Sequence, residues 1–138
     1  MTTIELINAE LLKDLTTVEA GETFFDLHNN YVCTNINYKL QAKTLSFLFE
    51  PGLADVTKNP LCLLFENVTF SNFELYLKST VDSSTLDSFY RGRYEIEGSL
   101  FEYTPTGEAY FYMEFIEGDS FEFFSSKVSL IEKSRLSI

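Results

Sequence analysis

The residue types at positions 26 and 28 could perform acid–base or metal chemistry. Asp26 stands two positions before His28, the only histidine of the chain. Histidine titrates near neutrality, so an Asp–His pair suits proton transfer or metal binding. Either site needs further groups, and the chain has no second His and no closely spaced cysteine pair. The turn-favouring pair Asn29-Asn30 follows, so backbone hydrogen bonding is the simpler explanation. We predict a structural His28 at the entrance to a strand, and no metal.

The candidate nucleophiles do not favour an enzyme either. Cys33 and Cys62 are the two thiols that could use His28 as a base, and both lie in apolar, strand-like stretches typical of ordinary sheet or core residues. The chain has no G-x-S-x-G elbow and no glycine-rich phosphate loop. Its many carboxylates suit a solvated sheet face as well as a glycosidase-like pair. We therefore expect a non-enzymatic protein with no catalytic residues and no cofactor.

The acidic residues carry the strongest signal. The formal net charge is -11, and nine acidic residues against two basic ones fall between positions 86 and 124, so this segment holds -7 of the total. Alternating strands would gather several of these carboxylates with tyrosines on one face, which repels nucleic acid and attracts basic protein surfaces. Acidity that serves solubility alone is the competing interpretation. The predicted binding residues are Glu95, Glu97, Tyr110, Tyr112 and Glu114.

Length and composition bound the class of protein. The 138 residues fit one domain, so we expect a single domain over residues 1–138. Hydrophobic residues make up 45% and aromatic residues 16%, too apolar for a disordered chain. The cysteine usage and the absence of a leader-like start predict reduced thiols and a cytoplasmic location. No apolar stretch approaches the roughly 20 residues that cross a bilayer, so we expect no membrane span. The oligomeric state stays open.

The elements that would position these residues begin with a predicted helix. Apolar residues recur at spacings of three and four from Ile4 to Val18, and Gly21 follows as a stop signal. This spacing predicts a helix over residues 1–21. The short stretch from Ile4 to Ile7 also suits a strand.

From residue 30 to residue 132 the apolar period changes to two, which predicts an antiparallel β-domain. Residues 31–40, with Val32 and Ile36 on one face and Cys33 on the other, resemble a hairpin with "KTLSFLFE" (43–50). "LCLLFENVTF" (61–70) and "FELYLK" (73–78) follow, with a turn or bulge expected at Ser71-Asn72. Residues 53–60 and 79–88 have loop compositions.

The last third of the sequence predicts a meander of neighbouring strands. Its four alternating runs are "RYEIEGSLFEY" (93–103), "AYFYMEFIE" (109–117), "SFEFFSS" (120–126) and "KVSLIE" (127–132), with a bend or bulge at Gly98. The fold prediction is mainly β: an antiparallel β-sandwich or partly closed barrel of about seven or eight strands with an N-terminal helix. The predicted core comprises Phe47, Phe49, Leu63, Phe65, Phe111, Met113 and Phe115.

The order of "FFDLHNNYVCTNINY", "KTLSFLFE", "LLFENVTF" and "YFYMEFIEGDSFEFFSSKVSLIE" over residues 24–131 resembles small bacterial β-domain proteins, some of which are immunity proteins of polymorphic toxin systems. The resemblance implies a β-sandwich-like fold and, for the immunity members, toxin neutralisation by direct binding. It brings no catalytic residues. Our functional prediction is a protein-binding β-domain whose acidic face covers a basic partner. The alternative is a small-ligand-binding sandwich or barrel with a cavity lined by aromatic residues.

Overall fold

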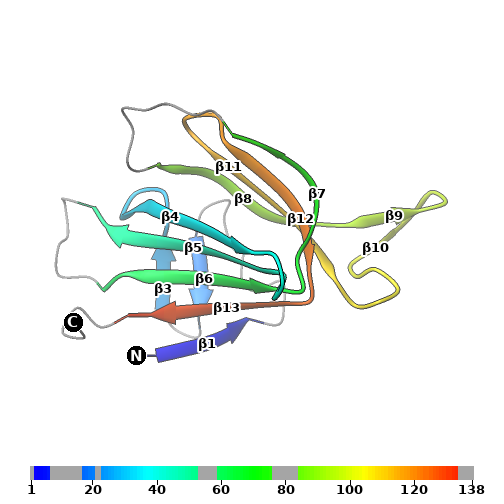
Figure 1. Cartoon of the computed structure of the whole chain (residues 1–138), viewed down its shortest axis with the longest axis horizontal. Helices are drawn as coiled ribbons and strands as arrows, with labels where there is room; N and C mark the ends of the chain where they lie inside the picture. Colours follow the sequence, from blue (N-terminus) through cyan, green and yellow to red (C-terminus); the bar gives the residue numbers. More distant parts are fainter. Residues whose placement is uncertain (1, 7–16, 21–22, 53–58, 76–83, 134–138) are drawn as a thin grey trace.

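The computed structural model describes residues 2–6, 17–20, 23–52, 59–75 and 84–133, and within these ranges the regular structure is all β (Figure 1). The strands are β1 (Thr2–Leu6), β2 (Thr17–Ala20), β3 (Thr23–Asp26), β4 (Tyr31–Lys39), β5 (Thr44–Pro51), β6 (Leu61–Glu66), β7 (Thr69–Glu74), β8 (Leu86–Gly92), β9 (Tyr94–Ile96), β10 (Ser99–Phe101), β11 (Ala109–Phe115), β12 (Ser120–Ser125) and β13 (Lys127–Glu132). The prediction of a mainly β, antiparallel fold is confirmed. The described strands number thirteen rather than seven or eight.

Two large antiparallel sheets face one another in a sandwich-like arrangement (Figure 1). The five-stranded sheet has the order β1-β13-β6-β5-β4, and the four-stranded sheet has the order β7-β12-β11-β8. Strands β2 and β3 form one separate hairpin, and β9 and β10 form another that extends away from both large sheets. We call the β9–β10 hairpin the arm.

Two neighbouring strands of the five-stranded sheet, β6 and β13, connect directly to two neighbouring strands of the four-stranded sheet, β7 and β12. β6 continues into β7, and β12 continues into β13, so both members of the pair cross at the same corner. Hydrogen bonds hold this corner: the Ser125 hydroxyl donates to the Glu66 carbonyl at 2.7 Å, and the Asn67 side-chain amide donates to the Ser126 hydroxyl at 2.7 Å. Ser125 and Ser126 therefore mark the point where the chain changes from one sheet to the other.

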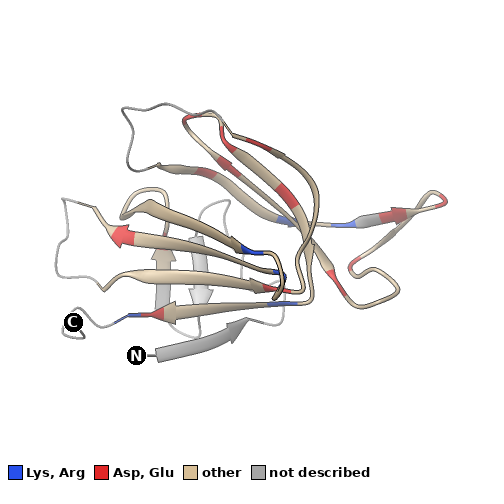
Figure 2. Cartoon of the chain, viewed as in Figure 1, with Lys and Arg blue, Asp and Glu red and all other residues tan. Residues whose placement is uncertain are grey.

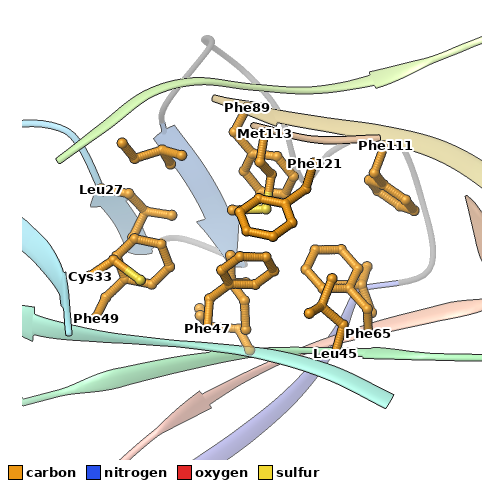
Figure 3. Close-up of a cluster of buried hydrophobic side chains, with 14 of the residues drawn as sticks. Leu27, Cys33, Leu45, Phe47, Phe49, Phe65, Phe89, Phe111, Met113 and Phe121 are labelled. Atoms are coloured by element: carbon orange, nitrogen blue, oxygen red, sulfur yellow. The ribbon is translucent and has the colours of Figure 1, made fainter. Parts of the chain in front are cut away.

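The core lies between the facing surfaces of the two large sheets, and the predicted core is confirmed (Figure 3). All seven predicted residues are at most 3% exposed. Rings of the five-stranded sheet meet rings of the four-stranded sheet: the Phe65 and Phe123 centroids are 4.8 Å apart, and the Phe47 and Phe121 centroids are 5.5 Å apart. These edge-on contacts add to the stabilisation that burial itself supplies.

The N-terminal helix predicted over residues 1–21 is wrong where the structure describes this segment. Thr2–Leu6 is a strand paired with β13, with Ile4 opposite Leu130, and Thr17–Ala20 is a strand paired with β3. Position 1, residues 7–16 and Gly21 lie outside the described residues. The edge of β13 offers hydrogen bonds to an extended partner, and this non-local pairing outweighs a local helical spacing.

The meander predicted for the last third is wrong at two places. Residues 94–101 fold back on themselves as the arm, with Glu97 at φ 50° and Gly98 at φ 82° in the turn. Gly98 therefore lies in a tight hairpin turn, of the kind that needs two positive φ angles, rather than in a bulge within one strand. β12 and β13 belong to different large sheets, so they are not paired neighbours.

Three smaller expectations are resolved in the middle of the chain. β4 and β5 form the predicted hairpin. A bulge between Cys33 and Asn35 reverses the alternation of β4 between its two faces. The buried residue before the bulge is therefore Cys33, and the prediction that Val32 lies on the apolar face is wrong. The predicted irregularity at Ser71 is a bulge opposite β12. The predicted loop 79–88 is wrong from Leu86 onward, where β8 begins; residues 79–83 and 53–58 lie outside the described residues.

Candidate binding face and candidate chemical residues

His28 lies in the turn between β3 and β4, as predicted, and hydrogen bonds hold it there. Its backbone N–H donates to the Asp26 carboxylate at 3.1 Å, and its Nδ1 lies 2.6 Å from the Leu86 carbonyl at the start of β8. Asn29 donates to the same carboxylate from its backbone and from its side chain. Burial raises the pKa of Asp26, but these hydrogen bonds outweigh it, so the pKa lies below its ordinary value. The Asp26–His28 pair thus fastens the turn to the edge of the four-stranded sheet.

The two cysteines form no disulfide with one another, and both thiols are poorly suited to nucleophilic chemistry. Cys33 is buried, and its backbone exchanges hydrogen bonds of 2.8 and 2.9 Å with Ser84, which links β4 to the residues just before β8. Burial raises the pKa of the Cys33 thiol to about 12 and also raises that of Cys62. Both thiols therefore stay protonated near neutral pH. Among the described residues, no cluster of three or more His, Cys, Asp or Glu side chains could hold a metal ion.

The outer surface of the four-stranded sheet carries the predicted combination of tyrosines and carboxylates. Between the inward-facing residues of β11, Tyr110, Tyr112 and Glu114 point outward and are half-buried. Tyr112 lies opposite Tyr90 of β8 on one side and opposite Glu122 of β12 on the other. We define these five residues as the tyrosine–glutamate face.

The residues of the tyrosine–glutamate face touch one another. The Tyr112 hydroxyl donates a 2.6 Å hydrogen bond to the Glu114 carboxylate, and the Tyr90 and Tyr112 ring centroids are 5.1 Å apart. That hydrogen bond is the main reason why the pKa of Tyr112 is strongly raised. Burial, followed by the charge and hydrogen bond of Glu122, raises the pKa of Tyr110 to about 12. The hydroxyls of Tyr110 and Tyr112 therefore stay neutral donors to carboxylates over the physiological pH range.

Glu95 and Glu97, the other two predicted binding residues, do not join this face. Glu95 lies in β9 and Glu97 lies in the turn of the arm, which belongs to a separate sheet. The structure therefore divides the predicted site in two: Tyr110, Tyr112 and Glu114 on the four-stranded sheet, and the two glutamates on the arm. Figure 2 shows acidic residues on both parts.

The base of the arm is held by Arg91. Its guanidinium carbon lies 4.7 Å from the centre of the Tyr103 ring, and its Nη2 lies 3.9 Å from a Glu102 carboxylate oxygen. The Arg91 side chain is 9% exposed, whereas that of Glu102 is 63% exposed, so this ion pair joins a nearly buried guanidinium to a solvent-exposed carboxylate. Arg91 is therefore engaged at the arm and does not neutralise the tyrosine–glutamate face.

Sequence reasoning missed two members of this face, Tyr90 and Glu122. The strand alternation in "SFEFFS" does carry a signal for Glu122, because it lies between the buried Phe121 and Phe123 and must point outward. Tyr90 follows the buried Phe89 in the same way. The register that places both side chains next to Tyr112 depends on pairing among β8, β11 and β12, which alternation within one strand cannot reveal.

Comparison with known proteins adds no further constraint. Within the described residues, no helix is long and apolar enough to cross a membrane. No protein-family model, curated protein or solved structure matches this chain.

Proposed function

We propose that the tyrosine–glutamate face and the arm bind a basic surface of a protein partner, and that the chain acts by binding rather than by catalysis. The observation that carries the proposal is the pairing state of the carboxylates. No Lys or Arg in the described part of the chain forms an ion pair with Glu95, Glu97, Glu114 or Glu122, whereas Glu102 and Glu66 pair with Arg91 and Lys127.

The charge balance around the face supports the same proposal. Residues 86–124 contain nine acidic and two basic residues, and both basic residues, Arg91 and Arg93, lie at the base of the arm (Figure 2). Like charges that share a sheet repel one another by up to about 1 kcal/mol for a close pair. Lys or Arg side chains of a partner would relieve this repulsion and would also be attracted over a distance before contact.

The tyrosines give the proposed interface a second source of affinity. Tyr90 is 39% exposed, and Tyr110 and Tyr112 are half-buried on the outer surface of the sheet. Tyrosine rings supply a large contact area at low entropy cost and attract cations over their faces, which matches Lys and Arg. The arm adds the exposed Leu100 and Phe101 beside its glutamates. The proposed partner therefore presents Lys or Arg side chains around an apolar centre.

The test is to capture partners from the source cell, identify them by mass spectrometry and measure the affinity with the purified partner at low and high salt. The Glu114→Gln/Glu122→Gln variant should bind about tenfold more weakly at low salt and lose much of its salt dependence. A Glu50→Gln/Glu132→Gln variant, which removes two charges from the five-stranded sheet, is the matched control and should bind like wild type. Equal affinity of both variants, or wild-type binding that is indifferent to salt, would contradict the proposal.

The resemblance to immunity proteins supplies a narrower proposal, namely that the basic partner is a toxin and that binding occurs in the cytoplasm. Sequencing the genes beside this one and co-expressing the neighbouring candidate toxin with the chain tests it directly. Rescue of growth by the wild-type chain, weakened by Glu114→Gln/Glu122→Gln, is the expected result. A partner that is harmless when expressed alone would contradict the toxin proposal and leave the protein-binding proposal standing.

A further inference from the structure

A separate apolar pocket lies where the two large sheets come together beside β4 and β7. Its volume is about 410 Å³. The lining residues are Ile36, Tyr38, Leu45, Phe70, Phe73, Leu75 and Phe121. Strands β4 and β5 belong to the five-stranded sheet and β7 and β12 to the four-stranded sheet, so both sheets build the pocket. None of these residues belongs to the tyrosine–glutamate face.

The bulge in β4 helps to form the pocket. Because the phase of β4 reverses after Cys33, Ile36 and Tyr38 turn toward β7 and not away from it. The Tyr38 ring packs edge-on against Phe70 with the centroids 4.9 Å apart, and Phe70 in turn lies 5.6 Å from Phe73. These aromatic contacts fix one wall.

The pocket has a buried floor and an exposed rim. Leu45 is 1% exposed and Phe121 is 4% exposed, so they form part of the core as well as the floor. At the rim, Ile36 is 37%, Phe73 55% and Leu75 51% exposed. Large apolar side chains gathered around a concave opening in this way are typical of a ligand site, because isolated exposed hydrophobic residues do not enclose a volume.

The chemistry of the lining restricts the ligand. Not one of the seven lining side chains is charged, and the Tyr38 hydroxyl is the only polar group that they carry. These described side chains offer no opposite charge to replace the hydration that a charged ligand would lose, which is strongly unfavourable. The volume falls in the range of small-molecule sites, about 300–1,000 Å³.

We propose that this pocket binds a small, neutral, apolar molecule, either aliphatic or aromatic, that carries no more than one hydroxyl or carbonyl group. The Tyr38 hydroxyl is the polar group that would meet it. This pocket is the site that we assign to the ligand-binding alternative suggested by the sequence. It is separate from the proposed protein interface on the outer face of the four-stranded sheet.

The test is a fluorescence titration of the purified full chain with the neutral apolar dye N-phenyl-1-naphthylamine. The dye should bind saturably with one molecule per chain. Leu75→Glu and Phe73→Glu each place a charge at the rim and should weaken binding at least about tenfold. Leu100→Glu makes the same change at a 59%-exposed residue of the arm and should bind the dye like wild type. Thermal unfolding of all three variants checks that each is folded.

Competition defines the ligand class. 1-Decanol should displace the dye, and decanoate, which has the same chain length and a negative charge, should displace it at least about tenfold less well. Absence of saturable dye binding, equal weakening by Leu100→Glu, or better displacement by decanoate would each overturn the proposal. A concentration-dependent dimer that excludes the dye and is abolished by Leu75→Glu would also overturn it, because a second copy of the chain would then be the occupant.

Discussion

The two sides of the four-stranded sheet use aromatic residues for different purposes. On the inner side of β11, Phe111 and Met113 are at most 3% exposed and pack against the five-stranded sheet. On the outer side of the same strand, Tyr110 and Tyr112 are half-buried and contact carboxylates. The hydroxyl group makes the difference, because it allows a ring to lie at a polar surface, whereas phenylalanine gains most when fully removed from water.

This difference shows that aromatic content alone does not separate stability from recognition. The inner rings are fixed by contacts with another sheet, so their removal should strongly destabilise the protein. The outer rings contact neighbours within one sheet, so their removal should leave the fold in place and change what the surface binds.

The largest contrast is expected between adjacent positions of β11. Phe111→Ala should lower the free energy of unfolding by about 3–5 kcal/mol, because it leaves a cavity against Phe65 and Phe123. Tyr112→Ala should lower it by only about 0.2–1 kcal/mol, the size of a cross-strand pair contribution such as that with Tyr90. Urea denaturation of both variants measures the difference, and similar losses for the two would contradict the assignment of inner and outer sides.

Gly92 is the position where the outer side should be intolerant. A Cβ atom there would lie 2.6 Å from the Tyr110 ring, which is also held by Phe124 and Glu122. Gly92→Ala should therefore cost about 1–3 kcal/mol through overpacking. The matched control is Gly52→Ala, whose Cβ would meet the Asn30 carbonyl at an ordinary 3.7 Å and should be close to neutral. Equal melting temperatures of these two variants would show that the Tyr110 ring can move aside without a loss of stability.

The carboxylate of Asp26 should contribute to stability in a way that the outer glutamates do not. Asp26→Ala removes the acceptor for three hydrogen bonds and should cost about 1 kcal/mol at neutral pH. The pKa of Asp26 is lower in the folded state than its ordinary 3.8, so the contribution is present above that value and is lost as the pH falls through the folded-state pKa. The unfolding free energies of wild type and Asp26→Ala should therefore converge in acid.

Glu114→Gln is the comparison for this experiment, because within the described residues the Glu114 carboxylate accepts a single side-chain hydrogen bond, from Tyr112. Its unfolding free energy should stay within about 0.5 kcal/mol of wild type. A gap between Asp26→Ala and wild type that persists unchanged at the lowest pH would indicate a role for Asp26 that does not depend on its charge.

The smallest expected effect is that of Tyr112→Phe. It removes only the hydroxyl that donates to Glu114 at a half-exposed site, so the unfolding free energy should fall by about 0.5 kcal/mol or less. Ultraviolet titration at high pH should at the same time lose one of the late-ionising tyrosines, since the pKa of Tyr112 is strongly raised. A larger loss of stability would show that the Tyr112–Glu114 hydrogen bond stabilises the fold, contrary to this prediction.

The sequence predicted the local structure best where one strand alternates regularly between two faces. In "AYFYMEF", Phe111 and Phe115 were correctly assigned to the core and Tyr112 to the surface, because alternation depends only on the geometry of an extended chain. Alternation was misleading where a bulge intervenes, as in β4, and helical spacing was misleading at Ile4, where the unpaired edge of β13 supplies a strand partner. The second failure involves a pairing with a distant part of the chain, whereas the bulge lies within the β4–β5 hairpin.

The candidate site was predictable in composition but not in assembly. The sequence by itself determined that acidic residues and tyrosines gather between positions 86 and 124 and that the Phe-rich phases of the strands form the core. Only the tertiary structure decided that Glu95 and Glu97 lie on the arm, that Tyr90 and Glu122 flank Tyr112, and that β4 and β7 enclose an apolar pocket. The physical reason is that the alternation of a residue's own strand determines the face on which its side chain lies. Its neighbours on that face depend on strand register and sheet order, and these are determined by residues far apart in the sequence.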